Sequence, residues 1–300
     1  MSKCLAGLTL ALALACAGSG AHAESWQVPQ PYMIPLPPTV QPSFELGLRY
    51  WASEGNTSIT NPSSKLRYDG TDGNSGEFVW RGQTEAKTFA KGFVGGGALS
   101  GGTLQGSNSD VGLASTTSNV DGGSLVYGTI DLGQRFDIVN SGPRFSLSPF
   151  VGLNIFQEKF AAFGASGDLS STKVISQDST WTNLRVGGEA RLTFCDRITL
   201  IADVAILPVA YLSNEASAYL SRATLGRVPN IDNSGTGWGY QIEAEARYDF
   251  NPRWSAGAGF RYWYAKVTDG DTSYRDSERL NLDEFSTKRL GAYGDVSYRF

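Results

Sequence analysis

Polar and apolar residues alternate along most of this 300-residue chain, most clearly at its end. Between positions 290 and 300 every second residue is apolar or small: Leu290, Ala292, Gly294, Val296 and Tyr298. The residues between them are mostly polar. A period of two predicts a β-strand with one apolar and one polar face.

The alternation recurs upstream and predicts about ten strands after Pro42. They are expected at residues 44–54, 65–82, 87–100, 123–137, 145–161, 180–194, 197–211, 237–250, 253–268 and 286–300. Two of them leave questions open. Phe89, Lys91 and Phe93 share one face of 87–100, so its register is ambiguous. Residues 69–76 interrupt 65–82, which predicts a bulged stretch near the outer rim or a separate short hairpin.

The connections between these strands alternate in length. Four are short (83–86, 138–144, 195–196 and 251–252), and five are longer (55–64, 101–122, 162–179, 212–236 and 269–285). An up-and-down transmembrane β-barrel has tight periplasmic turns and long outer loops, whereas a soluble Greek-key sandwich has no reason to sort its loops by length. The fold class expected is therefore all-β, a closed antiparallel up-and-down transmembrane barrel. An even number of strands places both ends of the barrel wall on the periplasmic side.

The alternate face of the strands is charged. A charge facing lipid costs about 2–4 kcal/mol at the bilayer midplane, so this face must line the lumen. The inward charge network comprises Glu45, Arg49, Arg185, Glu189, Arg191, Asp203, Glu243, Glu245, Arg247 and Asp295. The same assignment turns Glu77, Arg81, Asp131, Arg135, Glu158, Arg261, Lys266 and Arg299 inward. Both signs occur in similar numbers, which predicts ion pairs that fill a narrow barrel; Glu243 and Glu245 as perturbed functional carboxylates are the alternative.

Aromatic residues gather near the predicted strand ends. Amphipathic rings favour the level of the lipid headgroups, so two interfacial girdles are expected. The residues assigned to them are Tyr50, Trp51, Trp181, Trp238, Tyr240, Tyr248, Phe250, Trp254, Tyr262 to Tyr264, Tyr298 and Phe300.

The first 42 residues differ from the rest. Residues 1–23 have the form of a secretory signal peptide: Lys3 is followed by an apolar run from Leu5 to Ala17 and a small-x-small cleavage site at 21–23. Lipoprotein processing at Cys16 is the alternative. Residues 24–42 carry six prolines and are expected to form an extended periplasmic lead-in. The barrel is then expected to cover 43–300.

Cleavage after Ala23 would remove the single histidine, His22, and leave Cys195 as the one cysteine. Such a chain has no disulfide within it, no His-containing triad and no His metal site. No cofactor or metal is expected. The net charge of −4 argues against nucleic acid as a partner. The glycine-rich stretch 95–102 lacks the Lys-Ser/Thr of a phosphate loop, and close backbone approach is the simpler explanation.

The ten-strand pattern, the order of loop lengths and the terminal strand of residues 44–300 resemble the omptins, ten-stranded bacterial outer-membrane barrels. Gly95-Gly-Gly-Ala-Leu-Ser-Gly-Gly-Thr-Leu104 is similar to the approach to one omptin catalytic aspartate pair. The resemblance implies an outer-membrane location and a terminal strand that the barrel-assembly machinery recognises, here through Val296, Tyr298 and Phe300. Omptins are proteases with an Asp pair on one wall of the outer mouth and an Asp-His couple on the other.

The chain departs from the omptin pattern at the catalytic positions. Residues 105–110 carry only Asp110, and Asp232 is followed by Asn233 rather than histidine. We therefore expect a monomeric barrel without omptin-type catalysis, whose outer loops contact lipid, lipopolysaccharide or the surroundings. Basic loop residues such as Arg222, Arg227, Arg275 and Arg279 are candidates for lipid phosphates. A narrow porin-like channel is one alternative, and a surface hydrolase that uses Asp110 and Asp232 is another.

Overall fold

A computed structural model describes residues 42–62, 64–108, 113–140, 142–164, 171–194, 196–219, 227–274 and 279–300. The predicted signal peptide and all of the proline-rich lead-in except Pro42 lie outside these residues, as do Asp110, Cys195, Arg222 and Arg275. Among the described residues no helix is long and apolar enough to cross a membrane.

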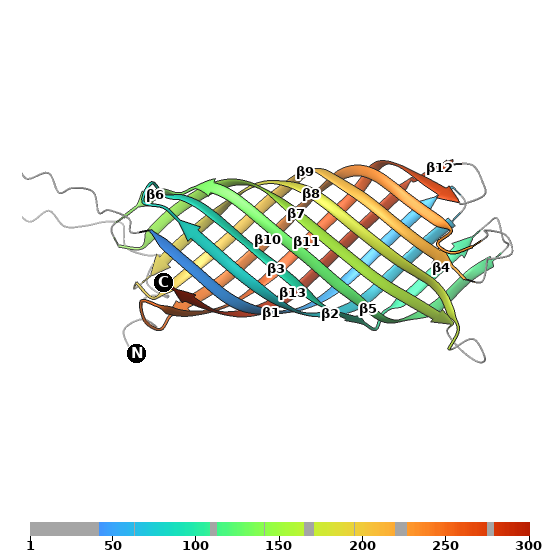
Figure 1. Cartoon of the computed structure of the whole chain (residues 1–300), viewed down its shortest axis with the longest axis horizontal. Coiled ribbons are helices and arrows are strands. Elements are labelled where there is room, and N and C mark those ends of the chain that lie inside the picture. Colours follow the sequence, from blue (N-terminus) through green and yellow to red (C-terminus); the bar gives the residue numbers. More distant parts are fainter. Residues whose placement is uncertain are drawn as a thin grey trace, which may run out of the picture. The chain divides into compact units, whose positions relative to one another are not determined.

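The described strands form one closed antiparallel sheet, as predicted (Figure 1). They are β1 (Ser43–Asn61), β2 (Ser64–Gln83), β3 (Thr88–Ser100), β4 (Thr103–Asn108), β5 (Leu113–Gln134), β6 (Phe136–Val139), β7 (Arg144–Gly164), β8 (Lys173–Phe194), β9 (Ile198–Ala218), β10 (Ile231–Asp249), β11 (Trp254–Tyr274), β12 (Arg279–Asn281) and β13 (Glu284–Arg299). Three positions in the wall are each shared by two consecutive strands: β3 and β4 both pair with β2, β5 and β6 both pair with β7, and β12 and β13 both pair with β11. The described wall therefore has ten strand positions.

The barrel closes between its first and last strands. β1 and β13 pair without interruption from Glu45↔Arg299 to Thr60↔Glu284. The backbone N–H of Phe300 donates to the Phe44 carbonyl at 2.9 Å. The closed barrel expected from the sequence is confirmed, and the pairing of its first and last strands continues well beyond Glu54.

The two ends of the barrel differ. We call the end that carries Phe300 and the short connections after β2, β6, β8 and β10 the turn end, and the opposite end the loop end. Strand limits at the turn end agree with the prediction to within a few residues. At the loop end the strands run on: 55–64, predicted to be a loop, is mostly strand, since β1 reaches Asn61 and pairs it with Ser64. The other four predicted long loops are likewise shortened by strand.

The loop-end strands were predicted as loops because their outer face is in contact with water and not with lipid. A strand beyond the lipid needs no apolar outer face, so period-two contrast disappears while the hydrogen-bonded ladder continues. The strands at the loop end carry many Ser, Thr and Asn residues on both faces, so their sequence resembles that of a loop.

Two open questions of register are resolved. In β2 the pairing shifts between Gly55↔Thr71 and Thr57↔Tyr68, with Gly70 at φ 68°, so the interruption is a β-bulge and not a separate hairpin. In β3 the side chains of Phe89, Lys91 and Phe93 point into the lumen, because each contacts an inward aromatic or charged group.

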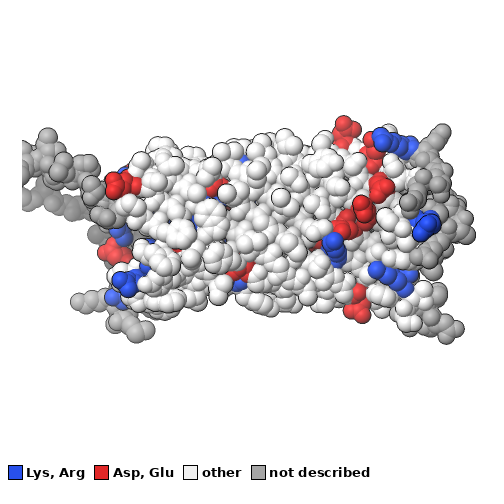
Figure 2. Space-filling view, in the orientation of Figure 1, with Lys and Arg blue, Asp and Glu red and all other residues white. Residues whose placement is uncertain are grey.

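The outer surface carries an apolar belt. Leu48 is 70% exposed and Phe260 65%, and many further Val, Leu and Ile side chains face outward. Figure 2 shows a broad, mostly uncoloured band around the middle of the visible face, with charged residues gathered toward the two ends. Exposed apolar surface on this scale matches a wall that faces hydrocarbon.

The girdle prediction is partly wrong. Phe44, Trp254, Tyr298 and Phe300 form ring contacts of 4.9–6.0 Å at the turn end, and Trp238, Tyr240, Tyr262 and Tyr264 form a second outward cluster. Trp51, Trp181 and Trp263, however, are almost fully buried in the lumen. Their positions alternate with outward neighbours, so proximity to a strand end could not give the face on which they lie.

The apolar belt yields a first prediction. Val204→Arg in β9 places a charge in the lipid-facing belt and should reduce the free energy of unfolding by about 2–4 kcal/mol. Ser213→Arg, outward on the same strand but beyond the belt, should change it by less than about 1 kcal/mol. Urea titration of the barrel in phospholipid vesicles measures both. Equal losses would place the lipid boundary elsewhere.

Candidate functional site in the barrel lumen

The lumen is filled by charged side chains in balanced number. The paired residues comprise nine bases (Arg49, Arg81, Lys91, Arg185, Arg191, Arg247, Arg261, Arg289 and Arg299) and nine acids (Glu45, Glu77, Asp131, Glu158, Glu189, Asp203, Glu243, Glu245 and Asp295). We call these eighteen residues the lumen network. Ion pairs between them link strands that are not neighbours in the wall.

Near the turn end, Glu189 of β8 is surrounded by three cations. It accepts from Arg81 Nη1 at 2.8 Å, from Lys91 Nζ at 2.7 Å and from Arg191 Nε at 2.5 Å. Lys91 also pairs with Asp203 of β9. One carboxylate thereby joins strands β2 and β3 to the opposite wall.

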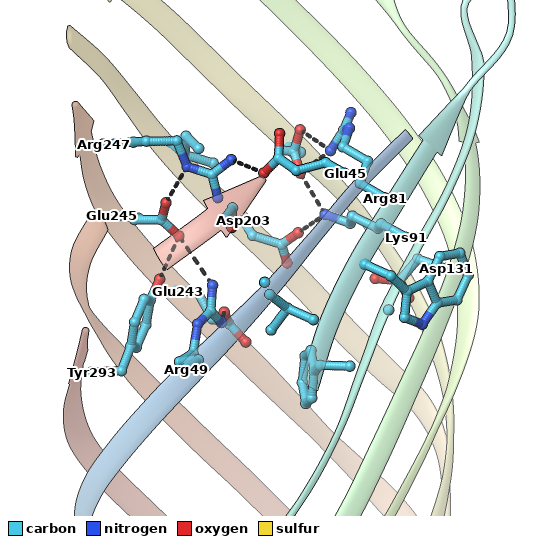
Figure 3. Close-up of a pocket in the computed structure, with 18 of the residues that line it drawn as sticks. Glu45, Arg49, Arg81, Lys91, Asp131, Asp203, Glu243, Glu245, Arg247 and Tyr293 are labelled. Atoms are coloured by element: carbon cyan, nitrogen blue, oxygen red, sulfur yellow. Dashed lines mark hydrogen bonds and ion pairs between the residues drawn. The ribbon is translucent and has the colours of Figure 1, made fainter. Parts of the chain in front are cut away.

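A second group surrounds Arg49 of β1. Its guanidinium contacts Asp295 at 3.0 Å, Glu245 at 3.1 Å and Glu243 at 3.4 Å. Arg247 bridges Glu245 and Glu45 at 2.8 and 2.5 Å, so Glu245 is shared between Arg49 and Arg247. Figure 3 shows Arg49 and Glu45 from β1 converging with Glu245 and Arg247 from β10.

A third group is centred on Arg185 of β8. It donates to Asp131 at 2.9 Å, to Asp203 at 3.3 Å and to the amide oxygen of Gln241. Asn154 extends this group, since its side-chain oxygen accepts from both Asn183 and Gln241. The buried polar groups here are satisfied mainly by one another, which is the condition for tolerating them in a dry interior.

Arg261 of β11 occupies the middle of the lumen with no exposed surface. It pairs with Glu77 of β2, and with Glu243 at 2.8 Å. Four of the aromatic rings around its guanidinium are those of Phe93, Trp51, Trp263 and Tyr293, with centroids at 4.3, 4.9, 5.1 and 5.6 Å. Charge pairing and cation–π attraction therefore act on one group.

A glycine makes room for this aromatic cage. A Cβ added at Gly95 would lie 2.7 Å from the ring of Tyr127, whose hydroxyl donates to Glu77 at 2.7 Å. The glycine-rich stretch 95–102 was predicted to allow close approach. At Gly95 it allows the Tyr127 ring to approach beside Arg261.

The loop-end half of the lumen is closed by apolar side chains. They include Ile59, Tyr68, Leu99, Leu104, Val120, Phe160, Ile175, Leu212, Val267 and Phe285, all buried. We call them the apolar plug. Just inside it, Arg289 pairs with Glu158 at 2.7 Å and contacts Thr71 at 3.1 Å.

Little free volume remains inside the wall. One lumen cavity of about 100 Å³ lies among Glu45, Arg81, Lys91, Glu189 and Arg247 toward the turn end. A second cavity of about 10 Å³ lies near Asn154 and Arg289. The first has room for several waters, whereas the second holds at most one.

All ten residues predicted to form the inward network lie in the lumen network. Lys266 was assigned inward wrongly: its outward-facing Nζ lies 3.6 Å from Glu284 on the loop-end surface, because Ala265 and Val267 take the inward positions. Lys91, whose face the sequence left open, also joins the network, and Arg289 was missed. Arg289 has the same parity as Asp295 and Arg299, and continuing the alternation by three residue pairs would have found it.

The predicted catalytic candidates are not brought together in the described structure. Asp232 lies exposed on the outer face of β10, opposite Glu215 and Ser273, while its neighbour Asn233 turns inward. Asp110 lies outside the described residues. Within those residues, no group of three His, Cys, Asp or Glu side chains is arranged to hold a metal ion.

No protein-family model matches the chain, and no curated protein is similar to it in sequence. Among solved structures, the outer membrane protease OmpT from Escherichia coli matches with a TM-score of 0.58 and 10% identity, over 88% of this chain and 98% of that chain. The fold is therefore omptin-like, that of an outer-membrane β-barrel. At this identity the likeness concerns the fold alone.

Two further barrels match less well. The translocator domain of the autotransporter NalP from Neisseria meningitidis gives a TM-score of 0.37 at 11% identity, over 85% of this chain and 88% of that chain. The outer membrane protein OprG from Pseudomonas aeruginosa gives 0.34 at 11% identity, over 87% and 96%. These scores are too low to carry an argument.

The cage around Arg261 yields a second prediction. Arg261→Leu removes the closer of the two arginines that Glu77 and Glu243 share and leaves only the longer contacts to Arg49, so the free energy of unfolding should fall by about 3–5 kcal/mol. Urea titration in vesicles measures the loss. Arg67→Leu removes a 2.8 Å pair with Asp69 that is largely solvated, and it should cost less than about 1 kcal/mol. Similar losses in both variants would contradict a special role for the cage.

Proposed function

We propose that the protein is an integral outer-membrane barrel with a closed lumen, non-catalytic, which acts as a structural or surface-interaction element through its loop end. The packed lumen is the observation that carries this proposal. The lumen network occupies the turn-end half, and the apolar plug occupies the other half. The two cavities described inside the wall, of about 100 and 10 Å³, are small for an aqueous pore.

The orientation follows from the fold. In bacterial barrels of this class tight turns face the periplasm and longer segments face outward. We therefore place the turn end at the periplasm and the loop end outside the cell. The polar strands above the apolar belt then project into the lipopolysaccharide layer or the medium, where they are available to partners.

The partners proposed are the lipids of the outer membrane, including lipopolysaccharide, and the barrel-assembly machinery. Of the basic loop candidates, Arg227 and Arg279 lie near the loop end, where lipid phosphates would be reached. The protein is proposed to be a monomer, because the wall is closed within one chain and β1 and β13 leave no free sheet edge.

The two alternatives have less support. A channel would need the charged and apolar side chains of the lumen to move aside together. A hydrolase built on Asp232 and its neighbour Glu215 would have to work on the outer face of the wall, where no described histidine assists it.

The closed lumen yields a third prediction. Protein reconstituted in planar bilayers should give no steady conductance, because hydrated ions cannot pass the apolar plug. An open porin reconstituted in parallel shows that insertion and recording work, and gel mobility before and after boiling reports the folded fraction. Sustained ohmic steps from heat-modifiable protein would overturn the closed-lumen proposal.

The terminal strand yields a fourth prediction. Phe300 is 71% exposed and meets the Tyr298 ring edge to face at a centroid distance of 4.9 Å, so its ring is available to an assembly partner while its backbone closes the barrel. Phe300→Ala should lower the rate of assembly in cells several-fold and leave spontaneous folding into vesicles nearly unchanged. Phe250→Ala, another exposed ring at the turn end, is the control. If both variants assemble at the native rate, recognition through Phe300 fails.

A further inference from the structure

A groove of about 720 Å³ crosses the outer surface over β2, β1, β13 and β11. We call it the outer groove. Ala52 and Ala292 form its floor, Tyr262 and Phe260 one wall, and Asp72 and Asn74 the other. Its volume falls within the range of about 300–1,000 Å³ typical of ligand sites.

The groove continues along the apolar belt. A second depression of about 600 Å³ shares Phe260 and Ala292 with it and extends toward the turn end over Ala244, Ala246 and Ala258. Small side chains on three adjacent strands produce this trench. A chain-like apolar ligand could therefore lie lengthwise on the wall, from the groove into the middle of the belt.

The loop end of the groove carries three charged side chains without partners. Lys288, Glu54 and Asp72 all line it, and none forms a hydrogen bond or ion pair with a described residue. Some other outward cations of the loop end are paired, such as Lys159 with Asp178 at 2.7 Å and Lys266 with Glu284.

The two acids face each other. Glu54 and Asp72 are direct partners across β1 and β2, where Cβ atoms lie about 4.5–5.5 Å apart and like charges are destabilising. Lys288 is diagonal to Glu54 across β1 and β13, at about 7–8 Å. The groove therefore presents an acid pair that favours a cation beside one lysine that favours an anion.

We propose that the outer groove binds one zwitterionic glycerophospholipid with a primary ammonium headgroup. Its ammonium group lies between Glu54 and Asp72, its phosphate contacts Lys288, and one acyl chain follows the alanine trench past Phe260. Charge complementarity selects this occupant: an anionic headgroup would satisfy Lys288 and be repelled by the acid pair. The inference rests on the proposed membrane-embedded barrel.

Native mass spectrometry of the folded protein in detergent, with equal amounts of phosphatidylethanolamine and phosphatidylglycerol, tests the proposal. The native protein should retain one phosphatidylethanolamine in preference. In E54Q/D72N that preference over phosphatidylglycerol should fall by about fivefold, the size expected for two solvated charge interactions. In K288Q retention of both phospholipids should fall.

A matched acid pair serves as control. Glu215 and Asp232 are direct partners on the outer faces of β9 and β10, away from the groove. E215Q/D232N should keep the native preference. Equal retention of the two lipids by the native protein, an unchanged preference in E54Q/D72N, or a dimer mass in place of the lipid-bound monomer would overturn the proposal.

The outcome is separable from that of the proposed function. The protein could show a heat-dependent gel shift and no conductance but no lipid preference. That result would contradict lipid binding in the outer groove and leave the closed-lumen proposal intact. A protein that stays in the soluble fraction would remove both.

Discussion

Ion pairs that cross the lumen hold this barrel wall in one register. Arg81 of β2 reaches Glu189 of β8, and Arg289 of β13 reaches Glu158 of β7. Because a strand alternates its side chains, a slip of one residue in any of these strands would turn the lumen charges of that strand toward lipid. The penalty of about 2–4 kcal/mol for each such charge makes the slipped arrangement inaccessible. The network therefore specifies the fold, whether or not each pair adds net stability.

The same interaction explains what could be predicted from the sequence. Charges that recur with a period of two leave one possible face in a membrane wall, so Arg49, Arg185 and Glu243 could be assigned inward without a structure. Lys266 shows where this reasoning ends: beyond the lipid a charge is tolerated on either face. The loop-end strands were missed for the same reason, since water removes the contrast on which the pattern depends.

The inward position of the lumen aromatic residues could not be predicted for another reason. Trp51 and Trp263 follow the parity of inward residues, but an aromatic ring is as acceptable at the lipid interface as in a packed interior. Only the contact of both rings with Arg261 shows that they lie in the interior and not at the lipid interface. For Trp51 this contact is far away in sequence. Alternation gives a face when one choice is costly, and it gives none when both are favourable.

Filling the lumen has a consequence for where this protein can act. A guanidinium caged by rings and held by two carboxylates cannot leave its place without exposing several buried charges, so the interior offers a ligand little that is mobile. The outer surface differs. There, Glu54 and Asp72 oppose each other with no internal cation, although the chain neutralises every acid of the lumen network. Two like charges beside an apolar groove are stabilised by a molecule that brings both a cation and an apolar chain. In a membrane wall the nearest molecule of this kind is a lipid.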